Sequence, residues 1–123
     1  MKYPVLFVQR AERNILDALS WYRKNAPEVL QRWHTSLNAA LRQLRENPDR
    51  FPLAHESVTF PYRLREVLFG AGRRKTHRVL FVVRPKVVMV YAIRHVAQKD
   101  FDPLEDECEL DSGDRSSESN QLG

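Results

Sequence analysis

The chain has 123 residues, 42% of them hydrophobic, a composition that predicts one folded domain with one modest core. Its only cysteine, Cys108, excludes an intrachain disulfide and counts against a zinc scaffold. The apolar run at residues 5–8 is too short for a signal peptide, and no stretch reaches the roughly 20 apolar residues of a membrane span. We therefore expect a cytoplasmic protein with no membrane association.

The charge is unevenly distributed along the chain. Residues 1–104 hold 19 Lys and Arg against 9 Asp and Glu, a net +10, whereas residues 105–123 hold 7 acids against Arg115 alone, a net −6. A body this basic attracts nucleic acid or an acidic protein, although an Arg-rich surface can also be merely solvated. We predict a folded domain over residues 1–104 and an acidic, disordered tail over residues 105–123, which has too few apolar side chains to fold.

The first half of the chain has the periodicity of two helices. An apolar run at residues 5–8 is followed by a helical stripe, and a break at residues 25–28 places Pro27 as the first residue of a second helix, which we expect to run to about Asn47. The short connection predicts an antiparallel helical hairpin. We expect its aromatic residues to pack in the core of the hairpin: Trp21, Tyr22 and Trp33.

The second half of the chain has the periodicity of strands. Residues 48–61 contain three prolines and predict an irregular crossing segment, which we expect Phe51, Leu53 and Phe60 to pin in place. The sequence then predicts three strands, over residues 62–68, 76–83 and 87–93. The fold class is therefore α+β: a helical hairpin packed on a small, twisted, antiparallel sheet of three strands, with residues 5–8 as a fourth strand along one edge.

Several phrases in this order resemble one toxin family. They are Ser20-Trp21-Tyr22, Ala40-Leu41-Arg42-Gln43-Leu44, Asn47-Pro48, Phe51-Pro52, Arg65-Glu66, Leu68-Phe69-Gly70, the strand opened by His77-Arg78, and Val90-Tyr91-Ala92-Ile93-Arg94-His95. Over about residues 5–104 the chain resembles the RelE/ParE toxins of type II toxin–antitoxin (plasmid stabilisation) systems. The resemblance implies a cognate antitoxin that covers the sheet edge or the basic face. It implies neither a metal nor a small-molecule cofactor.

The resemblance implies one of two activities, because RelE-like toxins cut mRNA on the ribosome without a metal, whereas ParE-like toxins bind DNA gyrase. Metal-free RNA cleavage needs cations on the phosphate. Arg63 and Arg65 are two residues apart on one predicted strand, and Arg78 on the next strand is expected on the same side, which would give a cluster of guanidinium groups. The alternative is that these arginines only solvate the outer face of the sheet.

Proton transfer would fall to His95, with His77 as a second candidate and Lys99 supplying a further charge. In RelE-like nucleases an Arg and then a Tyr follow the last strand, whereas here Gln98 takes the place of the Arg and no Tyr follows. These departures count against a nuclease.

A loop of three consecutive cations, Arg73, Arg74 and Lys75, is predicted to contact the nucleic-acid backbone, unless it is simply solvated. Three interpretations therefore stay open. The chain is a metal-independent endoribonuclease, a non-enzymatic toxin that inhibits gyrase, or a basic binding domain without toxicity.

Overall fold

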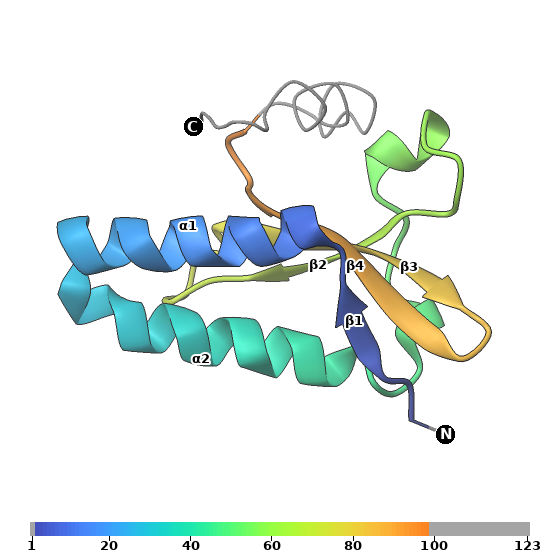
Figure 1. Cartoon of the computed structure of the whole chain (residues 1–123), viewed down its shortest axis with the longest axis horizontal. Helices are drawn as coiled ribbons and strands as arrows, with labels where there is room; N and C mark the ends of the chain where they lie inside the picture. Colours follow the sequence, from blue (N-terminus) through green and yellow to red (C-terminus); the bar gives the residue numbers. More distant parts are fainter. Residues whose placement is uncertain (1, 99–123) are drawn as a thin grey trace.

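The computed structural model describes residues 2–98. Along this part of the chain two α-helices and four β-strands follow one another, with two short 3-10 helices between α2 and β2 (Figure 1). The expected order of elements is confirmed, whereas the predicted acidic tail and the domain boundary at residue 104 lie outside the described residues. The elements are β1 Val5–Phe7, α1 Gln9–Asn25, α2 Pro27–Gln43, η1 Pro48–Arg50, η2 His55–Val58, β2 Arg65–Phe69, β3 His77–Arg84 and β4 Val87–His95.

The two helices form the expected hairpin. Helix α1 ends where the backbone N–H of Ala26 donates to the carbonyl of Tyr22 at 2.8 Å, and Pro27 is the first residue of α2, as predicted. Helix α2 ends at Gln43, earlier than the expected Asn47. After Gln43 the last turn tightens, because the N–H groups of Leu44 and Arg45 donate to the carbonyls three residues earlier, at 3.1 Å each. Asn47 then adopts a left-handed backbone with φ 50° immediately before Pro48, a conformation that no helix continues.

The sheet has the strand order β1-β4-β3-β2. Strands β2, β3 and β4 form the predicted antiparallel meander, with a bulge between Leu80 and Phe81. Strand β1 is the fourth strand expected along one edge, and it pairs in parallel with β4, with Val5 opposite Val88, so the sheet is mixed. Strands β1 and β2 are therefore the two edges.

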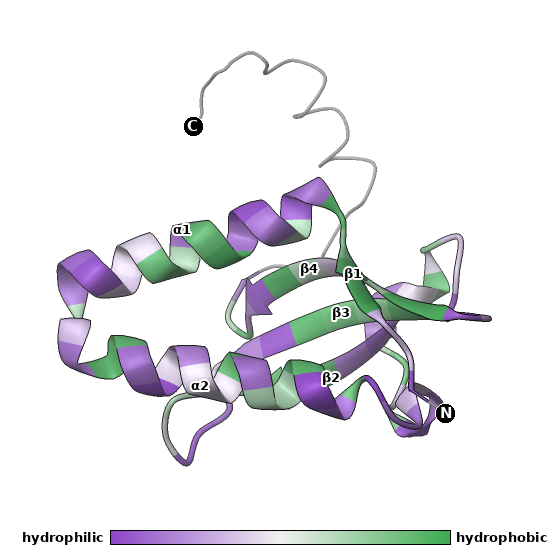
Figure 2. Cartoon of the chain, turned by 60° about the horizontal axis from the view of Figure 1, so that its bottom comes forward, coloured by the Kyte–Doolittle hydropathy of each residue, from purple (hydrophilic) through white to green (hydrophobic). Residues whose placement is uncertain are grey.

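The main core lies between the helical hairpin and one face of the sheet. In Figure 2 the central strands β3 and β4 are largely hydrophobic, whereas the helices alternate hydrophobic and hydrophilic segments as amphipathic helices do. Trp33 is fully buried here, as expected, and Tyr22 packs beside it with ring centroids 5.4 Å apart. The prediction that Trp21 belongs to this core is wrong, because its side chain is 57% exposed, although its ring forms a T-shaped contact with that of Tyr22.

The crossing segment, residues 48–61, and the three residues that lead from it to β2 cover part of the opposite face of the sheet. Ala54, Phe60 and Leu64 form a second apolar cluster with Leu80, Val82 and Ala92. The segment is held at the edge of the sheet by a bridge between Leu53 and Arg65 and by the N–H of Ala54, which donates to the carbonyl of Leu64 at 2.8 Å. The small sheet is thus buried on both faces where β2 and β3 meet.

Candidate functional site

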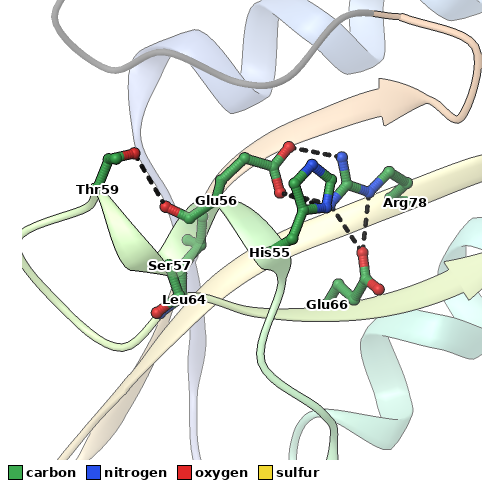
Figure 3. A network of polar contacts seen from close by, with 7 residues as sticks. All are labelled: His55, Glu56, Ser57, Thr59, Leu64, Glu66 and Arg78. Atoms are coloured by element: carbon green, nitrogen blue, oxygen red, sulfur yellow. Dashed lines mark hydrogen bonds and ion pairs between the residues drawn. The ribbon is translucent and has the colours of Figure 1, made fainter.

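The guanidinium of Arg78 on β3 is held by two carboxylates (Figure 3). Its Nη1 and Nη2 donate to the two carboxylate oxygens of Glu56, each at 2.7 Å, and its Nε donates to Oε1 of Glu66 at 2.9 Å. The side chains of Arg78 and Glu56 are only 9% and 2% exposed. The hydrogen bonds from Arg78 to Glu56 raise the pKa of Arg78, although burial opposes them, so the guanidinium is permanently charged.

The fold brings these three residues together from separate elements. Arg78 lies opposite Leu68 in the β2–β3 ladder, so Glu66, two residues before Leu68, projects from the same face. Glu56 comes from η2, which the second apolar cluster holds against this face. A bidentate pair between a segment outside the sheet and a central strand fixes where the crossing segment lies.

Sequence reasoning did not find Glu56. It lies 22 residues before Arg78 in an aperiodic segment, and no spacing rule connects the two positions. The available signal was that Glu56 and Asp49 are the only acids of the proline-containing crossing segment.

The expectation that Arg63, Arg65 and Arg78 converge on one face is wrong. Arg65 is opposite Phe81, so it lies on the face that packs against the helices, whereas Arg78 lies on the other face. The Nη1 of Arg65 donates to the carbonyl of Phe51 at 2.7 Å, and its Nη2 is 3.9 Å from a carboxylate oxygen of Asp49. Arg63 precedes β2 and is exposed.

The two candidate histidines lie side by side at one end of the sheet, with ring centroids 5.0 Å apart. His77 is buried, and its Nδ1 accepts a hydrogen bond from the indole N–H of Trp33 at 3.2 Å. Burial, together with the charge of His95, lowers the pKa of His77 to about 4, so its ring is neutral at physiological pH. His95 is exposed, and its Nδ1 accepts from the backbone N–H of Ala97 at 3.0 Å.

The remaining site candidates do not join this pair. Arg73, Arg74 and Lys75 are exposed in the β2–β3 loop. Lys99 lies outside the described residues, and the catalytic and nucleic-acid roles assigned from sequence stay predictions. Gln98, which takes the place of the nuclease Arg, accepts a hydrogen bond from the N–H of His95 through Oε1 at 2.7 Å. Within residues 2–98 no group of three His, Cys, Asp or Glu side chains is placed to hold a metal ion.

A shallow groove follows the outer side of α2 beside the edge strand β1. Near the start of β1 its lining includes four cations and one acid, together with Ala39 and Gln43: the charged residues are Lys2, Arg42, Arg45, Arg50 and Glu46. It continues into a second hollow that is lined by the apolar side chains of Val5, Phe7 and Leu41, together with Asn38, Arg42 and Arg45. No helix in the described part of the chain is long and apolar enough to cross a membrane.

The fold and its sequence pattern define a known class of protein. The family model described as ParE toxin of type II toxin-antitoxin system, parDE, matches residues 5–100, which include both α-helices and all four strands described above. The chain belongs to this family. It is the toxin component of a type II toxin–antitoxin system and has an antitoxin as its partner, which confirms the resemblance drawn from the sequence. A comparison with curated proteins gave no match.

Proposed function

We propose that this toxin acts by binding a target protein, and that the target is DNA gyrase, as the resemblance to ParE-like toxins implies. The observation that carries the proposal is the environment of Arg78, the residue that best matched a phosphate-binding role in the sequence. Its three guanidinium nitrogens donate to two carboxylates, so the group of three side chains carries a net negative charge and repels a phosphate. Releasing Arg78 for catalysis would leave Glu56, a buried carboxylate, without its counter-charge, at a cost of several kcal/mol.

The other groups of a metal-free nuclease are also dispersed. Such an enzyme needs a cation on the phosphate and a proton donor or acceptor within hydrogen-bond reach of the same atoms. Arg65 is engaged on the face opposite to Arg78, and His77 is a buried acceptor for Trp33. Contact with a protein requires none of these groups, which favours the gyrase interpretation over RNA cleavage.

Exposed apolar side chains on α1 support recognition of a protein. Leu16 and Trp21 are 65% and 57% exposed, and large exposed aromatic residues are typical of the side chains that dominate protein–protein binding energy. We assign the target-binding surface to the exposed part of α1 around Trp21.

The antitoxin would then bind at the edge strand β1. The other edge strand, β2, is partly covered, because the bridge from Leu53 to Arg65 and the hydrogen bond from the N–H of Glu66 to the carbonyl of Pro52 occupy its outer side. Beside β1 runs the groove with an apolar floor and a cationic rim. An acidic segment with apolar side chains, added as a strand to β1, fits this surface.

The test compares both activities with the same purified chain. The chain is added to gyrase with relaxed plasmid and ATP and, in parallel, to a translation reaction with a labelled message. We expect loss of supercoiling, intact message and recovery of supercoiling when antitoxin is added. Cleavage of the message with unchanged supercoiling would refute the proposal, and the absence of both effects would favour a binding domain without toxicity.

A matched pair of variants locates the target-binding surface. Trp21→Ala removes the exposed aromatic side chain of α1 and is expected to weaken gyrase inhibition by at least about tenfold, as expected for a residue that dominates binding. Val58→Ala removes an 88% exposed apolar side chain from η2 and is expected to change nothing. Equal inhibition by the two variants would show that α1 does not carry the contact.

A further inference from the structure

The loop between β2 and β3 presents three cations from a fixed position. At its start the N–H of Gly70 donates to the hydroxyl of Ser36 on α2 at 3.0 Å, and at its end the N–H of Thr76 donates to the carbonyl of Phe69 at 3.0 Å. A Cβ at Gly70 would lie 2.4 Å from the carbonyl oxygen of Arg74, so the loop folds directly back over this glycine. Both ends of the loop are therefore anchored to the rest of the fold.

The three consecutive cations of this loop, Arg73, Arg74 and Lys75, are all exposed, and we call them the cationic corner. Within residues 2–98 none of their side chains forms a hydrogen bond or an ion pair. The carboxylate nearest in the preceding strand, Glu66, is bound to Arg78 on β3. The cationic corner is thus a concentrated positive charge without a counter-charge in the described part of the chain.

The chain passes this corner again at the end of β4. His95 pairs with His77 in the β3–β4 ladder, and the N–H of Val96 donates to the carbonyl of Thr76, the residue next to Lys75, at 2.8 Å. The last residues that the structure describes, 96–98, therefore follow a backbone hydrogen bond to the residue next to the cationic corner.

The residues that come next in the sequence carry the opposite charge. Residues 100–114 lie outside the described part of the chain and contain eight Asp and Glu but no Lys or Arg. Asp100 is four residues after Val96 and Glu105 is nine, and extended chain covers at most about 3.5 Å per residue, or roughly 14 Å and 32 Å. The acids can therefore reach the corner within the same molecule.

We propose that the cationic corner binds the chain's own acidic segment, residues 100–114, and that this segment thereby competes with polyanions for the corner. A tethered partner acts at an effective concentration of the order of millimolar, which is enough for a multiply charged contact in modest salt. The proposal does not depend on the toxin's target.

The arginines Arg42 and Arg45 provide an internal comparison. Arg42 lies in the last turn of α2 and Arg45 just after it, and both line the groove that also contains Lys2, near the start of β1. Because β1 is parallel to β4, the groove lies beside the beginning of β4. The acidic segment follows the end of β4 in the sequence, and the two ends of this nine-residue strand are about 30 Å apart. The nearest acids are expected to engage the cationic corner and not these arginines.

The experiment measures binding of a 20-base-pair DNA duplex to the full chain by fluorescence anisotropy in 50 mM NaCl. In one variant the eight acids of residues 100–114 are changed to Asn and Gln, and this variant is expected to bind about tenfold more tightly, because three cations become free for phosphates. In a chain that also carries Arg73→Gln, Arg74→Gln and Lys75→Gln, the same change of the eight acids is expected to raise the affinity for DNA less than twofold.

The matched control is the background Arg42→Gln with Arg45→Gln, in which the tenfold gain is expected to persist. The amide chemical shifts of residues 72–75 give a direct readout of the contact. They should differ between the full chain and the variant without the eight acids. Adding 1 M NaCl to the full chain should change them in the same direction. An equal gain in both backgrounds would mean that the acids act only through net charge and would overturn the proposal. Unchanged affinity or unchanged shifts would overturn it as well.

Discussion

The substitution Glu56→Gln isolates the charge of the buried ion pair, because glutamine keeps the shape of the side chain. Removing one partner of a buried pair costs about 3–5 kcal/mol. Here Glu66 still contacts the guanidinium of Arg78, and the amide oxygen of the new glutamine can accept one hydrogen bond, so we expect a loss of about 3 kcal/mol, at the lower end of that range. This is a large fraction of the roughly 5–15 kcal/mol that stabilises a typical domain.

The comparison with Glu66→Gln makes the expectation specific. The side chain of Glu66 is 25% exposed and contacts Arg78 through a single oxygen, so solvent screens this pair and we expect a loss of about 1 kcal/mol. Urea denaturation of each variant, followed by circular dichroism, gives both free energies of unfolding. Glu46→Gln, which removes only a 3.8 Å contact between exposed side chains, is the control and should leave the unfolding curve unchanged. A Glu66→Gln variant that loses as much stability as Glu56→Gln would refute the reasoning.

The remaining predictions concern packing, the loop and pH. Trp33→Ala should lower the free energy of unfolding, measured by urea denaturation, by about 4 kcal/mol, whereas Trp21→Ala, at an exposed position, should lower it by less than about 1 kcal/mol. Similar losses for the two variants would contradict the assignment of Trp33 to the core. Gly70→Ala should destabilise the fold by about 1–3 kcal/mol, because its Cβ would meet a backbone oxygen at 2.4 Å, whereas Gly72→Ala meets nothing within 4 Å and should be neutral in thermal melts. The unfolded chain protonates His77 near pH 6.5 and the native chain only near pH 4, so His77 contributes stability above pH 6.5 that is lost as the pH falls toward 4. The loss should be about 3 kcal/mol and should disappear in His77→Gln, and an unchanged pH dependence in that variant would contradict it.

The sequence predicts the arrangement of the elements well, because local patterns determine them. Side-chain periodicity predicts the apolar stripes of both helices and the β-branched runs of β3 and β4. Proline's preference for the first turn of a helix predicts where α2 begins, at Pro27. The expected end of α2 at Asn47 is wrong, since periodicity does not reveal the tightened turn after Gln43 or the left-handed backbone of Asn47.

The candidate site could not be predicted in the same way, because it depends on which face of the sheet each residue occupies. Arg65 and Arg78 lie on opposite faces only because Arg65 is opposite Phe81, and no local pattern determines this register. The partner of Arg78 could not be predicted either, because Glu56 reaches it through tertiary packing of an irregular segment.

The parallel pairing of β1 with β4 affects how the toxin is made. Val5 is opposite Val88, so almost the whole fold separates the two partners along the chain. During synthesis β1 leaves the ribosome first and has no neighbouring strand until β4 follows, and contacts of such long range form slowly. A newly made toxin therefore passes through a stage in which β1 has no partner strand, and this stage lasts until β4 has been made.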